Sequence, residues 1–231
     1  LSRREFLGRA AAFGLTLPVA TKLLSSTALA QGPQRGGDLV CGLVGGESTN
    51  SLDPALTLTP VPQIFIKCWG ETLVYAAPED SSAKPMLAES WEASDDVKTW
   101  TFKSRKGVTF HDGKGLTADD VLATFKRHSD PNAKSGALGV MENIAEMKID
   151  GGNLVIALKN ADADLPLLLS DYHVVIQPNG GLDKPDAGIG TGPYKIEEDE
   201  PGVRHLVSKY ENYWRDDVGF VLVSIDPDRD T

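Results

Sequence analysis

The sequence predicts an α/β fold, because segments with two different hydrophobic periods occur along one chain. Trp100 and Phe102 alternate with polar neighbours over residues 99–103, which is the period of a half-buried strand. Apolar residues at helical spacing instead occupy residues 64–74. With 231 residues, of which 41% are hydrophobic, the chain is long enough to bury a substantial core.

The most informative stretch runs from residue 88 to residue 121. It begins with Ala-Glu-Ser-Trp and the predicted strand 99–103, and Val108 and Phe110 then repeat the alternation as a second short strand. Asp112-Gly113 follows, a dipeptide that favours a tight turn. Thr117 and Asp120 have the spacing of a capping box, so we expect a helix to start near residue 118.

This stretch, AESWEAS followed by TWTFKSRKGVTFHDGKGLTADDV, resembles the N-terminal lobe of extracellular solute-binding proteins of peptide and nickel ABC importers, family 5. GTGPYK at residues 190–195, YENYW at 210–214 and the hairpin at 147–158 resemble the same family. Two positions depart from its pattern: Ser104 replaces a usual aliphatic residue, and a Pro common before Thr117 is absent. The resemblance implies a type II periplasmic-binding-protein fold of the peptide-binding class.

The N-terminus has the pattern of a twin-arginine export signal. Arg3 and Arg4 precede an Ala-rich apolar stretch, and Ala28 and Ala30 form the small-residue pattern of a signal peptidase site. We therefore expect residues 1–30 to be removed by cleavage before Gln31, with the Tat translocase as a partner during export. The alternative is an N-terminal amphipathic helix. No Cys stands at the cleavage point, so a lipoprotein anchor is not expected.

The charge balance argues against nucleic acid as a partner. The predicted signal contains four of the 23 basic residues and one of the 33 acidic residues, so the remainder has 19 basic and 32 acidic residues and a formal charge of −13. Phosphates demand a basic face. An acidic protein also stays away from anionic lipid headgroups.

The two cysteines, Cys41 and Cys68, leave two readings open. Both lie in apolar settings, which favours two buried thiols acting as small hydrophobes. An oxidising compartment would also permit them to pair. Their spacing matches no metal-binding Cys motif.

The remaining elements follow from local patterns. We expect a buried strand at 38–44, a helix over 64–74 packed on it, a linker at 78–85, a hairpin turning at 150–153, a short helix at 165–169, and strands at 173–177, 194–197, 203–207 and 220–225. Asp130-Pro131-Asn132 should end the helix that starts near residue 118. We expect the strand at 220–225 to be a poorly covered edge.

The resemblance implies a domain organisation. Residues 36–80 and 188–231 would form a split first-lobe subdomain, and residues 81–187 a subdomain inserted into it. The second lobe of the family would be absent, which would leave a cleft wall exposed at Leu58, Trp69 and residues 174–176. Leu58, Thr59 and Pro60 would lie on the cleft and offer backbone groups to an extended ligand; the alternative is an ordinary surface loop.

The function implied by the resemblance is that of a periplasmic receptor. It would capture a peptide or similar small solute and deliver it to an ABC permease and its ATPase in the inner membrane, with no cofactor and no catalysis. One alternative is an isolated lobe that acts as a non-transporting remnant or a permease-docking module.

The other alternative is a Tat-exported metal-dependent hydrolase. His111-Asp112, Asp119-Asp120 and His128 are the residues that could form a metal cluster. Each also has a local structural explanation, such as a turn or a helix end, and we expect His111 to face solvent. HExxH, Gly-x-Ser-x-Gly and Cys-x-x-Cys motifs are absent from the sequence.

Overall fold

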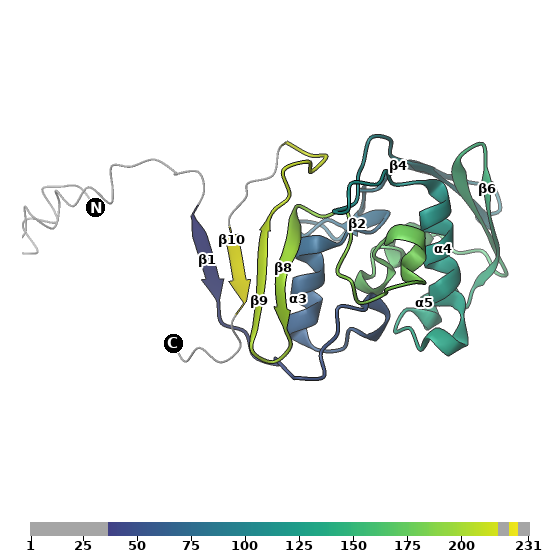
Figure 1. Ribbon diagram of the computed structural model, residues 1–231. Helices are drawn as coiled ribbons and strands as arrows, with labels where there is room; N and C mark the ends of the chain where they lie inside the picture. Colours follow the sequence, from purple (N-terminus) through teal and green to yellow (C-terminus); the bar gives the residue numbers. More distant parts are fainter. Residues whose placement is uncertain (1–36, 217–221, 226–231) are drawn as a thin grey trace, which may run out of the picture. The chain divides into compact units, whose positions relative to one another are not determined.

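The computed structural model describes residues 37–216 and the strand 222–225 (Figure 1). The predicted signal residues Arg3, Arg4, Ala28 and Ala30 lie outside the described residues. Within the described part, no helix combines the length and the apolar character needed to cross a membrane.

The architecture is α/β, as predicted. The strands are β1 (Asp38–Cys41), β2 (Val74–Ala76), β3 (Ala83–Pro85), β4 (Ala88–Ala93), β5 (Thr99–Ser104), β6 (Ile144–Asp150), β7 (Asn153–Leu158), β8 (Tyr194–Glu200), β9 (Arg204–Lys209) and β10 (Leu222–Ile225). The α-helices are α3 (Pro60–Trp69), α4 (Ala118–Ser129), α5 (Leu138–Met141) and α6 (Leu165–Leu168). Short 3₁₀ helices are η2 (Pro54–Leu56), η3 (Pro131–Ala133), η4 (Tyr172–Val174) and η5 (Pro178–Gly181).

One four-stranded sheet has the order β1-β10-β9-β8. β10 pairs in parallel with β1 and antiparallel with β9, so the first and the last described strands are neighbours (Figure 1). Helix α3 packs against β8 and η4. Its Phe65 and Trp69 form a hydrophobic cluster with Val175 and Val207. Helix α3 therefore lies on β8 and β9, and its main contact is not the first strand, where it was expected to pack.

A second four-stranded sheet has the order β4-β5-β7-β6 and carries α4 (Figure 1). Phe102 on β5, Phe110, Phe125 on α4 and Ile156 on β7 are among the fully buried side chains of its core. The predicted capping box is confirmed, because the Thr117 side chain accepts from the Asp120 backbone and the Asp120 carboxylate accepts from the Thr117 backbone. The predicted hairpin at 147–158 is β6 and β7.

Three of the predicted elements near the N-terminal half are wrong in detail. The predicted buried strand at 38–44 is the shorter β1, and Leu39 and Val40 are about half exposed. The predicted linker at 78–85 contains β3, which pairs with β2 as a hairpin. The short strand expected around Val108 and Phe110 is a single bridge between Thr109 and Gly115.

Three further predictions are corrected by the structure. Residues 173–177 are buried but form η4 and irregular backbone, because the Ile176 N–H bonds to the Glu71 carbonyl outside any ladder. The strand β10 is internal to its sheet, so it is not a poorly covered edge. Of the expected exposed cleft wall, Trp69 and residues 174–176 are buried, and Leu58 alone is exposed.

Hydrogen bonds between His111 and the GTGPYK turn join the segment after β5 to the segment before β8. The His111 ring bonds to the Gly192 carbonyl at 2.9 Å, and the His111 backbone N–H donates to the Gly190 carbonyl. The ring is half-buried, and burial lowers the pKa of His111, so the prediction that it faces solvent is wrong. A Cβ on Gly192 would lie 2.6 Å from the carbonyl carbon of Trp69, so this glycine allows the turn to approach α3.

Cys41 and Cys68 are both free thiols and both half-buried. The Cys68 thiol lies 3.8 Å from the Ile64 carbonyl one helical turn earlier. Burial, together with the neighbouring Cys41, raises the pKa of Cys68 to about 11. Cys68 is therefore a thiol rather than a thiolate near neutral pH.

Candidate functional site

The expected binding residues Leu58, Thr59 and Pro60 lie in the loop between η2 and α3. Leu58 is 79% exposed, Thr59 is the residue before the helix, and Pro60 is its first residue. The Thr59 hydroxyl donates to the Asn50 side chain at 3.0 Å. The backbone N–H groups of Leu58 and Thr59 have no hydrogen-bond partner among the described residues, so this loop presents two successive donors.

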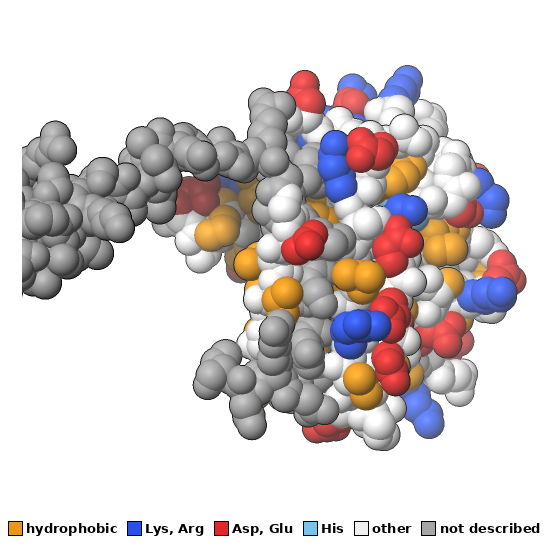
Figure 2. All heavy atoms as spheres, turned by 60° about the vertical axis from the view of Figure 1, so that its left-hand side comes forward, with side chains coloured by type: hydrophobic (Ala, Val, Ile, Leu, Met, Phe, Trp, Pro, Cys, Tyr) orange, Lys and Arg blue, Asp and Glu red, His pale blue; other side chains and the backbone are white. Residues whose placement is uncertain are grey.

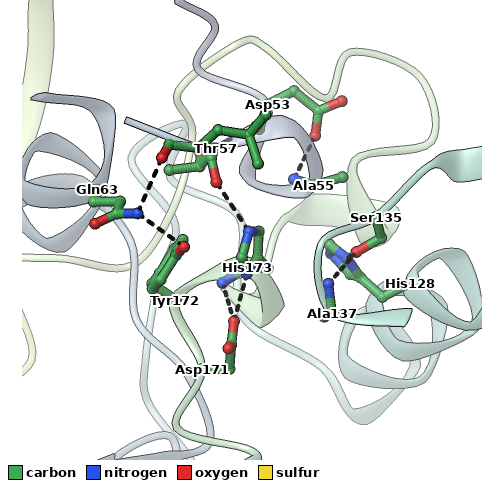
Figure 3. Close-up of polar contacts among 11 residues, drawn as sticks. Asp53, Ala55, Thr57, Gln63, His128, Ser135, Ala137, Asp171, Tyr172 and His173 are labelled. Atoms are coloured by element: carbon green, nitrogen blue, oxygen red, sulfur yellow. Dashed lines mark hydrogen bonds and ion pairs between the residues drawn. The ribbon is translucent and has the colours of Figure 1, made fainter. Parts of the chain in front are cut away.

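Gln63 on α3 fixes the geometry of this loop. Its side-chain nitrogen donates to the Leu58 carbonyl at 3.4 Å and to the Tyr172 hydroxyl at 3.0 Å (Figure 3). Tyr172 belongs to η4, far away in the sequence. The loop, the helix and η4 therefore meet at one polar contact, and the Tyr172 hydroxyl can still donate to a further group.

His173 forms a second bridge to the loop. Its Nε2 donates to the Thr57 carbonyl at 3.0 Å, and its Nδ1 faces the Asp171 carboxylate at 2.6 Å (Figure 3). Burial would raise the pKa of Asp171, but the hydrogen bonds from His173 outweigh burial and lower it. Both ring nitrogens of His173 thus face acceptors, the Thr57 carbonyl and the Asp171 carboxylate.

The segment 135–137 lies on the other side of His173. A Cβ on Gly136 would lie 2.3 Å from Nε2 of His173, and the Gly136 N–H donates to the Ala55 carbonyl at 2.9 Å. Ser135 accepts from the Ala137 N–H and contacts Nδ1 of His128 at 2.6 Å (Figure 3). Three separate segments thus converge on the η2–α3 loop.

An ion pair anchors the same loop to α4. Arg127 Nη2 lies 2.6 Å from both carboxylate oxygens of Asp53, and both side chains are about nine-tenths buried. Asp53 also accepts from the Ala55 N–H at 2.9 Å and caps η2. Because a buried pair is costly to break, the start of the loop is held firmly.

The residues considered for a metal cluster have separate local roles. His111 contacts Gly192, Asp120 caps α4, and His128 is fully buried beside Ser135. Among the described residues, no three His, Cys, Asp or Glu side chains form a group that could hold a metal ion. On the face shown in Figure 2, acidic and basic side chains are interspersed with hydrophobic ones, and no basic stripe is visible there.

Sequence reasoning proposed the loop at residues 58–60 but did not predict the side chains that contact it. His173 was predicted to begin a strand at 173–177, and the contacts of Asp53 with Arg127 were not predicted. The Asp-x-His spacing of Asp171 and His173 was an available signal, because an Asp side chain readily bonds to the backbone two residues later.

Comparisons with known proteins agree with this architecture. A family model described as bacterial extracellular solute-binding proteins, family 5 Middle, matches residues 82–228. A probable peptide ABC transporter periplasmic-binding protein from Sinorhizobium fredii is 29% identical over 221 residues, which cover 92% of this chain and 40% of that protein. The glutathione-binding protein GsiB of Escherichia coli is 30% identical over 208 residues, covering 87% of this chain and 39% of that protein.

A solved structure is similar as well. The periplasmic binding protein DppA from Helicobacter pylori, in complex with the peptide STSA, superposes with a TM-score of 0.71 at 25% identity, covering 84% of this chain and 43% of that one. The fold and the matched segments define the periplasmic-binding-protein class. The chain belongs to the bacterial extracellular solute-binding proteins, family 5. It spans about 40% of the length of the curated relatives it matches.

Proposed function

We propose that this chain is part of a periplasmic receptor that captures a peptide or a similar small solute and delivers it to an ABC permease. One observation carries the proposal: beside Gln63 and Tyr172, the backbone N–H groups of Leu58 and Thr59 have no partner within residues 37–216 and 222–225. Successive backbone donors suit an extended peptide, whose carbonyls repeat along its length. The names of the relatives, peptide and glutathione binders, support the same class of solute.

The proposal includes a domain organisation and an export route. Residues 36–80 and 188–231 form one subdomain and 81–187 the other. Two hydrophobic clusters follow this division in part: one lies on α3, β8 and β9 and also includes Val175, and the other lies around the β4–β7 sheet and also includes Leu73 and Val74. The chain reaches the periplasm through the twin-arginine signal at 1–30 and is not a lipoprotein. The permease, its ATPase and the Tat translocase are the proposed partners.

Nuclear magnetic resonance titration of the purified chain with trialanine tests the proposed binding site. We expect shifts confined to backbone amides of residues 57–63 and 172–173. The affinity should be about 1 mM or weaker, because this chain spans only part of its relatives' length and closure around a ligand needs contacts on both sides. Absence of any shift, or shifts at other surfaces, would reject the site.

A matched pair of variants sharpens this test. Gln63→Leu removes the donor that fixes the Leu58 carbonyl and Tyr172, and it should weaken trialanine binding about three- to tenfold, the value of one neutral hydrogen bond. Lys67→Met changes an exposed residue of the same helix and should leave binding unchanged. Equal effects of both substitutions would contradict the assigned role of Gln63.

A further inference from the structure

The hydrogen bonds of the η2–α3 loop engage its backbone carbonyls and leave two of its N–H groups free. The carbonyls accept from Nε2 of His173 at Thr57 (3.0 Å), from Nε2 of Gln63 at Leu58 (3.4 Å) and from the Gln63 N–H at Thr59 (3.2 Å). The N–H groups of Leu58 and Thr59, by contrast, donate to no group in residues 37–216 or 222–225.

Two side chains fix the direction of these free donors. A peptide unit is planar, and in its trans form the C=O and the N–H point to opposite sides; the described part of the chain contains no cis peptide bond. His173 holds the Thr57 carbonyl and therefore directs the Leu58 N–H away from its own buried ring (Figure 3). Gln63 holds the Leu58 carbonyl and orients the Thr59 N–H in the same way.

Tyr172 adds a third donor at this loop. Its hydroxyl oxygen accepts from Gln63 Nε2 at 3.0 Å, so its proton remains available for another group. Burial and the neighbouring Asp171 charge raise the pKa of Tyr172, and the hydroxyl therefore keeps this proton near neutral pH.

The loop offers a solute few backbone acceptors in return. Thr57 is only 2% exposed, so its carbonyl is nearly closed to a solute, and the carbonyls of Leu58 and Thr59 already accept from Gln63. When a peptide adds to the edge of a sheet, both its carbonyls and its N–H groups are paired. Here the protein supplies partners for the carbonyls alone.

We propose that the η2–α3 loop binds its solute through the solute's oxygen acceptors, and that amide N–H groups of the solute are not needed there. This inference rests on the proposed function and deepens it, because it names the class of solute. The class is acyl compounds with carbonyl or carboxylate oxygens, and it includes peptides whose amide nitrogens carry alkyl groups.

Three tripeptides test the inference. Trisarcosine has the same atoms as trialanine, but its methyl groups are on the nitrogens, so its two amides have no N–H. Triglycine keeps the N–H groups and lacks the methyl groups, so it is the reference for trisarcosine. In resonance titrations of the purified chain, we expect all three to shift amides of residues 57–63 and 172–173.

The affinity for trisarcosine should lie within about threefold of that for triglycine. A part of this allowance, up to about twofold, covers the cis forms of its tertiary amides, which reduce the fraction able to bind. A larger loss of affinity, or shifts at other surfaces, would overturn the inference and leave the proposed function standing if trialanine still shifts the loop. Absence of loop shifts with all three peptides would reject both.

Two pairs of variants test the donors themselves. Leu58→Pro deletes one free N–H, and Thr57 has the extended backbone, φ −71° and ψ 112°, that a residue before proline prefers. It should weaken binding of trialanine and trisarcosine alike by about three- to tenfold, the value of one hydrogen bond. Leu58→Ala keeps the N–H and should weaken binding less.

Tyr172→Phe should likewise weaken both peptides about three- to tenfold, because it removes the hydroxyl donor. Tyr75→Phe deletes a hydroxyl on β2, outside the loop, and should leave both affinities unchanged. Equal effects of Leu58→Pro and Leu58→Ala, together with no effect of Tyr172→Phe, would show that these donors do not bind the solute.

Discussion

His128 has an imidazole that the fold holds in its neutral form. The ring is fully buried, and burial together with the Arg127 charge lowers the pKa of His128 to about 4. Since the pKa in the unfolded chain is about 6.5, the unfolded state binds a proton first as the pH falls. The contribution of neutral His128 to the free energy of unfolding is therefore fully present above about pH 6.5 and is lost as the pH falls towards 4.

This shift predicts an acid sensitivity that one substitution removes. His128 should contribute a loss of about 3 kcal/mol in the free energy of unfolding between pH 6.5 and pH 4. His128→Asn does not titrate, and its amide can still contact Ser135, so its unfolding free energy should fall less steeply. Urea denaturation of both proteins at several pH values measures the difference; parallel pH profiles would contradict the assignment.

At this scale the sequence revealed residue types but not their partners. Arg127 lies in the last turn of α4, where a cation suits the helix dipole, yet its bond to Asp53 joins residues 74 positions apart. His111 was predicted to face solvent because it alternates with Phe110. Local alternation says nothing about the Gly192 turn that covers it, since that contact depends on the tertiary fold.

The GTGPYK turn and α3 meet through glycines that need space rather than unusual backbone angles. Gly190 and Gly192 do not have positive φ values, unlike Gly107 and Gly113. A Cβ on Gly192 would lie 2.6 Å from the Trp69 carbonyl carbon and 2.8 Å from the Cys68 carbonyl oxygen. Both are backbone atoms, so neither can move aside as a flexible side chain would.

Gly192→Ala should therefore destabilise the protein by about 2 kcal/mol or more, the effect of overpacking. Gly139→Ala is the matched control, because a Cβ at Gly139 meets nothing within 4 Å and the residue lies in α5. That control should be neutral or slightly stabilising, since Ala favours helix. Chemical denaturation of both variants checks the contrast, and similar unfolding free energies would show that the close approach is not what matters.

Elements with strong local signals were predictable, and elements defined by distant partners were not. The β6–β7 hairpin follows from alternation and a Gly-Gly turn, and α4 from its capping box. Residues 173–177 have the composition of a strand, but their buried backbone bonds to Glu71 and Thr124 instead of a neighbouring strand. The loop at 58–60 came from resemblance, whereas its contacts with η4 required the folded chain.

On the scale of the whole molecule, exposed apolar side chains gather near the proposed solute site. Leu56, Leu58 and Ile64 are 48%, 79% and 45% exposed, and all three belong to the η2–α3 segment. Exposed apolar surface promotes association. We expect concentration-dependent self-association of the purified chain in light scattering.

Leu58→Glu should reduce this self-association, because it removes the most exposed of the three side chains and adds charge. Val203→Glu alters a side chain that is 46% exposed, in the β8–β9 turn, and should reduce it less. A monomer at all concentrations for the unsubstituted chain, or an equal effect of both variants, would contradict the prediction.

The parallel pairing of β1 with β10 also sets the order in which the chain can fold during synthesis. β1 leaves the ribosome before the β4–β7 sheet, but its neighbour in the first sheet, residues 222–225, is made only after that second sheet. Until then β1 has no β10 to pair with, while the hairpins β6–β7 and β8–β9 can form from adjacent residues. The β4–β7 sheet with α4 can therefore assemble first on the nascent chain, whereas the sheet beside α3 is completed only after residues 222–225 have emerged.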